Sequence, residues 1–251
     1  MSPETTCLQL DVKKKSDFNY FGKTIISTIE NGDLKSEKDI NIANNSTSNK
    51  AMNDNLQKLR IKLQELALLI NYDQPYMLSS GVESPYIFNV KNICFNDGLI
   101  FLADALLDIL NDEEFDYISG LEVGAIPIIE MVCCRSRSNL SKKHIDGFFV
   151  RKVAKKHGTK NKIDGIRDIE KLSNATVIVL DDVTTTGKSV LNSVKELRSL
   201  GCKIDKVITI IDRKEGAEEN LNNDGIKLIS LFTSDDFNIP TENEWRKDNN
   251  K

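Results

Sequence analysis

The sequence has few of the residues that build metal sites. It contains five cysteines and two histidines among 251 residues, and no two cysteines have C-x-x-C spacing. A structural zinc site needs four such ligands at close spacing, so we expect no zinc site. Scattered cysteines without a disulfide framework are typical of a reduced compartment, and we therefore expect a cytoplasmic protein.

Long apolar runs and an excess of positive charge are missing as well. No apolar run approaches the ~20 residues needed to cross a bilayer, and the N-terminus lacks the apolar core of a signal peptide, so no membrane partner is expected. The net charge of −4 argues against a general basic surface for nucleic acid. Apolar residues make up 39% of the chain and charged residues 29%, which is typical of a soluble globular protein.

The two ends of the chain are also poor in apolar residues. Residues 1–52 are predicted to be a disordered N-terminal extension, because asparagine, serine and threonine are concentrated between residues 35 and 53. Residues 241–251 are predicted to form a polar C-terminal tail, although Phe237 and Trp245 could pack against the domain. One globular domain is therefore expected between residues 53 and 240.

Apolar helices and strands alternate through this domain. The patterns predict helices at residues 56–70, 97–110, 125–134, 190–200 and 215–223, and longer strands at 115–119, 147–150, 176–180, 206–211 and 226–232. Two shorter strands are expected around a turn, at 76–78 and 84–88. This alternation predicts an α/β fold with a mainly parallel central sheet and helices on both faces. Ligands in such sheets bind at the carboxyl ends of the strands.

The most informative stretch is TVIVLDDVTTTGKS at residues 176–189. A β-branched strand is followed by Asp181 and Asp182, by a threonine-rich loop and by a helix. Backbone N–H groups at the start of that helix, together with the hydroxyls, predict an anion site. Two acids beside it favour a ligand with phosphate and hydroxyl groups, or phosphate with Mg²⁺. A P-loop is excluded because Asp182 stands where that motif requires glycine.

A second strand–loop–helix junction lies at residues 120–124, where Gly120 and Gly124 could let backbone amides approach an anion. Close packing at the junction is the alternative explanation for these two glycines. Arg213 follows another strand, and its guanidinium matches a carboxylate ligand. Pairing of Arg213 with Asp212 or Glu215 is the structural alternative.

A basic segment, FVRKVAKKHG, follows the strand that ends near residue 150. A run of this kind is often only a solvated loop. Here it accompanies two predicted anion sites, and a mobile loop can carry cations to a phosphorylated substrate and exclude water. We therefore expect the segment to serve the same site.

These motifs resemble those of a known enzyme family. Residues 176–189 resemble the 5-phosphoribosyl-1-pyrophosphate (PRPP) motif of type I phosphoribosyltransferases. The stretch SSGVESPY at 79–86 and the basic segment resemble orotate phosphoribosyltransferases, and the resemblance extends over about residues 56–240. It implies the type I phosphoribosyltransferase-like fold, with a small N-terminal hood at about 56–95 and a core at about 97–233.

The resemblance also implies an activity. Orotate and PRPP would give orotidine 5′-monophosphate and pyrophosphate, a step of pyrimidine (UMP) biosynthesis, with Mg²⁺ held mainly through PRPP near Asp181 and Asp182. A homodimer with shared active sites is implied, because the basic loop of the family reaches the neighbouring subunit. Two alternatives stay open: transfer to another base, since Ser79 stands where many members have lysine, and a PRPP-sensing regulator without catalysis. Val123 likewise replaces a lysine found in a bacterial subset.

The resemblance assigns roles to named residues. The catalytic residues would be Arg151, Lys152, Lys155, His157, Asp181 and Asp182, all of which would also contact PRPP. The remaining PRPP-binding residues would be Val183, Thr184, Thr185, Thr186, Gly187, Lys188 and Ser189 for the 5′-phosphate, and Gly120, Leu121, Glu122, Val123 and Gly124 for pyrophosphate. Orotate would contact Thr185, Arg213 and Ser79.

Overall fold

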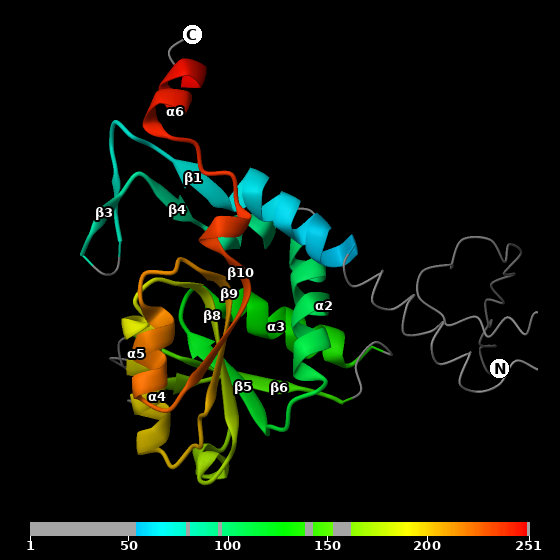
Figure 1. Cartoon of the computed structure of the whole chain (residues 1–251). Coiled ribbons are helices and arrows are strands. Elements are labelled where there is room, and N and C mark those ends of the chain that lie inside the picture. The colour runs from blue at the N-terminus through cyan, green and yellow to red at the C-terminus, as the bar shows by residue number, and fades with distance from the viewer. Residues whose placement is uncertain (1–53, 79–80, 95–96, 139–142, 153–161, 250–251) are drawn as a thin grey trace, which may run out of the picture. The chain divides into compact units, whose positions relative to one another are not determined.

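The computed structural model describes residues 54–78, 81–94, 97–138, 143–152 and 162–249 (Figure 1). Three predicted site residues, Ser79, Lys155 and His157, lie outside the described residues, as does the predicted extension at 1–52.

The centre of the domain is a six-stranded sheet in the order β10-β9-β8-β5-β6-β7. Its strands are β5 (Tyr117–Leu121), β6 (Asp146–Val150), β7 (Ile163–Asp164), β8 (Val177–Thr184), β9 (Lys206–Asp212) and β10 (Lys227–Thr233). All neighbouring strands pair in parallel except β7, which pairs antiparallel with the end of β6. The mainly parallel sheet predicted from the sequence is confirmed.

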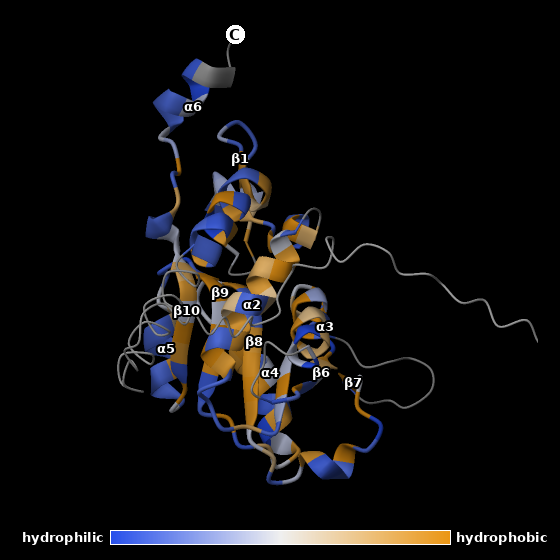
Figure 2. Cartoon of the chain, turned by 90° about the vertical axis from the view of Figure 1, so that its right-hand side faces the viewer, coloured by the Kyte–Doolittle hydropathy of each residue, from blue (hydrophilic) through white to orange (hydrophobic). Residues whose placement is uncertain are grey.

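Helices cover both faces of this sheet. The helices are α2 (Gly98–Leu110), α3 (Ala125–Ser136), α4 (Lys188–Ser199) and α5 (Ala217–Asn223). One core joins α2 and α3 to alternate residues of β8 such as Ile178 and Leu180, and the other joins α4 and α5 to Val177 and Val179. The apolar strands between amphipathic helices are visible in Figure 2, and they explain why β8 has no polar alternation in its first half.

A smaller unit, the hood, is built from segments before α2. It contains residues 54–62 in α-helix, the π-helical turn Leu63–Ala67, and the antiparallel pairs β1 (Leu68–Ile70) with β4 (Tyr86–Phe88) and β2 (Tyr76–Met77) with β3 (Glu83–Ser84). The 3₁₀ turn η2 (Val90–Cys94) leads back to the core.

The last part of the chain packs on the hood. After the 3₁₀ turn η4 (Ser234–Asp236), Phe237 is buried, with its ring 4.8 Å from that of Phe88. The helix α6 (Glu242–Asn249) follows, and its Trp245 ring lies 5.8 Å from that of Tyr72. Both aromatic residues that the sequence marked out therefore contact the hood.

Four predicted elements have wrong boundaries. The first helix stops before Leu68, because Leu68–Ile70 pair with β4. The residues predicted as one strand at 84–88 divide between β3 and β4, which belong to different sheets. β8 continues beyond Leu180 to Thr184 because its ladder with β9 continues to the pair Thr184–Asp212, and β5 likewise includes Gly120 and Leu121.

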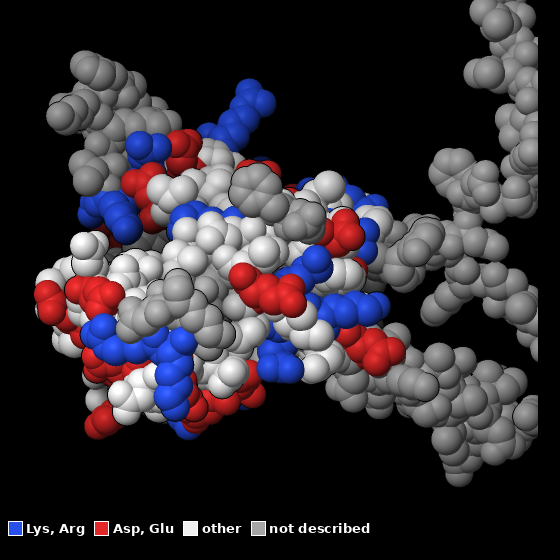
Figure 3. All heavy atoms as spheres, turned by 90° about the horizontal axis from the view of Figure 1, so that it is seen from above, with Lys and Arg blue, Asp and Glu red and all other residues white. Residues whose placement is uncertain are grey.

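The surface at the hood end carries both signs of charge. Seen from above the view of Figure 1, acidic and basic side chains are interspersed (Figure 3). None of the helices in the described part of the chain combines the length and the apolar character that a bilayer crossing requires.

Candidate active site

The end of β8 places two carboxylates beside the hydroxyl-rich loop. Thr184 donates a hydrogen bond from its hydroxyl to Asp181 Oδ2 at 2.7 Å, and this Thr184 hydroxyl also lies 2.9 Å from the hydroxyl of the buried Thr209. Asp182 Oδ1 accepts a hydrogen bond of 3.0 Å from the backbone N–H of Val183. Both acids therefore belong to the strand β8, whereas the sequence predicted that they follow the strand.

The environment of Asp181 favours its protonated form. Burial, and secondarily the carboxylate of Asp182, raise the pKa of Asp181 to about 7, against the hydrogen bond from Thr184. Part of the residue is still accessible to solvent. The carboxyl group can therefore gain or lose a proton near neutral pH, depending on what hydroxyl or cation faces it.

The predicted phosphate loop forms a cavity of about 170 Å³. Its lining consists of Asp181, Asn192 and every residue from Val183 to Val190. Gly187 has a φ of +75° and precedes the first turn of α4, so the chain turns sharply and presents that turn to the cavity. Asn220 on α5 holds the loop by donating to the carbonyl of Thr186 at 2.9 Å. The residues predicted to hold the 5′-phosphate are therefore assembled around one cavity.

The junction between β5 and α3 lies against the end of β8. A Cβ atom at Gly120 would come within 2.5 Å of the Leu180 carbonyl oxygen, and one at Gly124 within 2.2 Å of Asp182 Oδ2. Close approach to β8 is thus a sufficient reason for both glycines. Val123 between them is exposed, and Glu122 accepts a hydrogen bond of 2.8 Å from the backbone N–H of Lys152.

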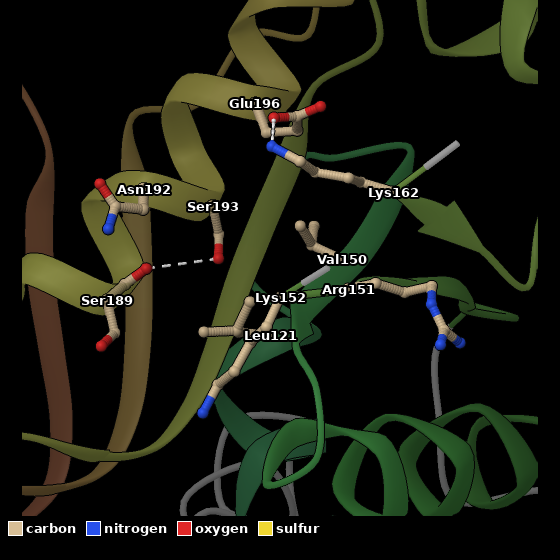
Figure 4. A pocket seen from close by; sticks show the side chains of 9 residues that line it. All are labelled: Leu121, Val150, Arg151, Lys152, Lys162, Ser189, Asn192, Ser193 and Glu196. Carbon is tan, nitrogen blue, oxygen red and sulfur yellow. Dashed lines mark hydrogen bonds and ion pairs between the residues drawn. The ribbon is translucent and has the colours of Figure 1, made fainter. Parts of the chain in front are cut away.

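The first two cations of the basic segment lie beside α4. Arg151 and Lys152 line a cavity of about 270 Å³ together with Leu121, Val150, Lys162, Ser189, Asn192, Ser193 and Glu196 (Figure 4). Ser189 and Asn192 also line the phosphate-loop cavity, so the two cavities adjoin. Lys162 forms an ion pair of 2.7 Å with Glu196, whereas Arg151 points away from that pair and lies 3.4 Å from Asp164.

The hood is joined to the core at the end of β9. Arg213, at the end of β9, is buried and donates to the Ser84 hydroxyl at 3.0 Å, to the Tyr86 carbonyl at 3.2 Å and to Glu215 at 2.8 Å. Its guanidinium also lies 4.3 Å from the centre of the Tyr86 ring. Pairing with Glu215, which the sequence left open, is therefore present, and Arg213 joins the core to the hood.

Sequence reasoning missed several residues of this region. Asn192 lines both cavities from one helical turn beyond Lys188 and Ser189, a spacing that could have indicated it. Lys162 and Glu196 come together across 34 positions of sequence, and Lys91 reaches Asp182 from the hood. No local pattern marks such pairs, because they are made only by the fold.

Comparison with known proteins agrees with these features. The phosphoribosyl transferase domain family matches residues 96–242. The orotate phosphoribosyltransferase of Bradyrhizobium sp. is 38% identical over 162 residues, 64% of this chain and 86% of the relative. That of Methanocaldococcus jannaschii is 38% identical over 159 residues, 63% of this chain and 84% of the relative.

A solved structure extends the similarity to the fold. The orotate phosphoribosyltransferase of Mycobacterium tuberculosis superposes with a TM-score of 0.59 and 25% sequence identity, covering 72% of this chain and 98% of that one. The predicted type I phosphoribosyltransferase-like fold is confirmed. The chain therefore belongs to the phosphoribosyltransferase family and, within it, to the orotate phosphoribosyltransferases.

Proposed function

We propose that this chain transfers the 5-phosphoribosyl group from PRPP to orotate, giving orotidine 5′-monophosphate and pyrophosphate in pyrimidine biosynthesis. The observation that carries the proposal is the single cavity lined by Asp181 and residues Val183–Val190, in a chain of this family. Hydroxyls, backbone amides and a carboxylate in one place suit a ligand with both phosphate and ribose hydroxyls.

In this proposal the cavity binds the phosphoribosyl part of PRPP. The amides at the start of α4 and the hydroxyls of Thr184–Thr186 and Ser189 hold the 5′-phosphate, assisted by Lys188. Asp181 and Asp182 accept hydrogen bonds from the ribose hydroxyls. Their negative charge also favours the positive charge that develops on the ribose ring as the bond to pyrophosphate breaks.

Pyrophosphate is assigned to the junction from Gly120 to Gly124, including Leu121, Glu122 and Val123. A nitrogen of the base attacks ribose C1, and the electron pair of the broken C–O bond leaves with pyrophosphate. Arg151 and Lys152, together with Lys155 and His157, neutralise that developing negative charge. No nucleophilic side chain is required.

The oxygen ligands near β8 fit Mg²⁺. Two adjacent carboxylates beside a phosphate site are typical of a magnesium ion bound mainly through substrate phosphates. Among the described residues, no cluster of three or more histidine, cysteine or acidic side chains forms a cage for a metal. Asp181 and Asp182 would face the ion, which supplies positive charge for the diphosphate of PRPP when bound.

The base would lie between the hood and the end of β9. Arg213, Thr185 and Ser79 are assigned to orotate. Arg213 already donates to Ser84, Tyr86 and Glu215, so its role toward the orotate carboxylate requires exchange of one of these hydrogen bonds. Other bases lack that carboxylate, and the arginine would then act only as a link between hood and core.

The remaining assignments concern the whole chain. Residues 53–240 are proposed as the phosphoribosyltransferase domain, 1–52 as an N-terminal extension and 241–251 as the C-terminal tail. The protein is proposed to act in the cytoplasm as a homodimer in which each basic loop serves the partner's site.

Two measurements test this assignment. Orotate, uracil, adenine and hypoxanthine are each offered with PRPP and Mg²⁺, and turnover of orotate alone is expected. Lys155→Ala is expected to lose turnover by roughly 100-fold while PRPP still binds, because a positioned cation acts mainly on the leaving group in the transition state. Turnover of a different base would contradict the assignment of orotate as the substrate. Unchanged turnover in Lys155→Ala would contradict the catalytic role of the basic segment. PRPP binding without turnover of any base favours the regulator.

A further inference from the structure

Lys91 lies on a turn of the hood that is fixed on both sides. It belongs to η2, between the buried residues Val90 and Ile93. Asn92 donates a hydrogen bond of 2.9 Å to the carbonyl of Leu66, which fastens the turn to the preceding helix. The base of the Lys91 side chain is therefore held by packing and hydrogen bonding.

The ammonium group of Lys91 faces the active-site acids. Its Nζ lies 4.0 Å from Asp182 Oδ2, with 46% of the Lys91 side chain and 22% of the Asp182 side chain exposed. A separation of 4.0 Å is an ion pair without a hydrogen bond, so this contact with Asp182 uses none of the three ammonium donors.

The same carboxylate adjoins the β5–α3 junction. A Cβ atom at Gly124 would lie 2.2 Å from Asp182 Oδ2, so the backbone at Gly124 is packed against the group that Lys91 faces. Gly124 directly precedes α3, whose first turn carries N–H groups without intrahelical partners. Lys91 and the start of α3 thus approach Asp182 from two different elements.

We infer that Lys91 is a PRPP-binding residue, whose ammonium group contacts the pyrophosphate oxygens at the β5–α3 junction. The inference rests on the proposed function and adds to it a cation contributed by the hood. Arg151 and Lys152, the first cations of the basic segment, come from the core, where they follow β6. Lys91 would therefore place positive charge near the leaving group before the basic segment acts, and would connect binding of PRPP to the hood that covers the base.

If Lys91 had only a structural role, its removal would destabilise the fold or disturb Asp182 without weakening the binding of pyrophosphate. Half-exposed ion pairs contribute little to folding stability, so removal of Lys91 is expected to leave the unfolding midpoint unchanged. If Lys91 only adjusted Asp182, its loss would alter contacts to ribose and leave binding of free pyrophosphate intact. Pyrophosphate and ribose 5-phosphate therefore separate the two roles.

The test is calorimetric binding of inorganic pyrophosphate and of ribose 5-phosphate, each with Mg²⁺, to the full-length protein. Lys91→Met is expected to weaken pyrophosphate binding roughly tenfold or more, as loss of a charge-assisted contact implies. Binding of ribose 5-phosphate should stay within twofold. Lys91→Arg should retain most of the pyrophosphate affinity. Lys227→Met is the matched control, since Lys227 is exposed at the amino end of the edge strand β10, whereas Asp182 lies toward the carboxyl end of β8.

Steady-state kinetics supply the second readout. Lys91→Met is expected to raise KM for PRPP with little change in KM for orotate. Pyrophosphate affinity of Lys91→Met within twofold of wild type, in a protein with an unchanged unfolding midpoint, overturns the inference. An equal loss of pyrophosphate affinity in Lys227→Met also overturns the inference. The binding measurement does not depend on the base, so absence of orotate turnover would contradict the proposed function and leave the result for Lys91 interpretable.

Discussion

Among single residues, Asp181 shows how a residue of the candidate site lowers the stability of the folded protein when it is ionised. Its raised pKa means that folding favours the protonated carboxyl group, so the folded protein binds more protons than the unfolded chain between about pH 4 and pH 7. The stabilising effect of that proton is complete below the unfolded pKa and is lost as the pH rises through the folded pKa of about 7. A carboxylate kept in such a place indicates a ligand that needs it.

Asp181→Asn should therefore stabilise the protein at high pH. The amide carries no charge to desolvate, so the variant is expected to exceed wild type in unfolding free energy by roughly 1–3 kcal/mol at pH 8, and to approach it near pH 4.5. Urea denaturation at both pH values measures this, with the exposed Asp224→Asn as control. A difference that does not grow with pH would contradict the raised pKa.

Gly124 is a second test at this scale. Alanine would put its Cβ atom 2.2 Å from Asp182 Oδ2, and either the carboxylate or the junction must move. Because small displacements of reacting groups have large effects on rate, kcat/KM for PRPP is expected to fall roughly 100-fold in Gly124→Ala. Ile100→Ala, at an exposed side chain of α2, should change it by less than threefold. Similar kinetics in the two variants would argue against the close contact.

At the scale of elements, the hood depends on the C-terminal segment. Phe237 packs between Phe88 of the hood and Phe232 of β10, with ring centres 4.8 and 5.8 Å away. Phe237→Ala is expected to lower the unfolding free energy by about 3–5 kcal/mol through loss of buried area and the cavity left behind. Met77→Ala, at a side chain that is 65% exposed, should change it by less than about 0.5 kcal/mol. Equal effects in chemical denaturation would show that Phe237 does not fasten the hood.

The elements also show what sequence could and could not predict. Apolar periodicity located α2, α3, α4 and all the long strands, because burial on one or two faces leaves a direct pattern. It failed at Leu68–Ile70, where helix and strand patterns look alike over three apolar residues and pairing with β4 decides. It also ended β8 too early, because Asp181 and Asp182 look like loop residues although their backbone continues the ladder with β9.

The candidate site was predictable to the extent that it is continuous in sequence. Asp181 and residues 183–190 line one cavity because strand, loop and helix follow each other directly. Lys91 and Lys162 were missed because only the folded chain brings the hood and the segment before β7 to this region. Asn192 was missed although its helical spacing from Lys188 and Ser189 could have indicated it. The contacts of Arg213 with the hood were hidden for the same reason.

At the scale of the whole molecule, the proposed homodimer makes a quantitative prediction. Lys155→Ala and Asp182→Asn are each expected to be nearly inactive. If the basic loop of one subunit serves the site of the other, a hybrid dimer has one site in which both parts are wild type. Mixing the two variants in equal amounts, with exchange of subunits, should then restore about a quarter of wild-type activity. No recovery, with hybrid dimers demonstrated by differential tagging, would contradict shared sites.

The proposed reaction is tested most directly by the ultraviolet absorbance of orotate in the presence of the purified full-length protein, PRPP and Mg²⁺. We expect the absorbance to fall only when protein, PRPP and Mg²⁺ are all present, with pyrophosphate formed in equal amount. An unchanged orotate signal, from a folded protein that binds PRPP, would contradict the assignment of orotate as substrate.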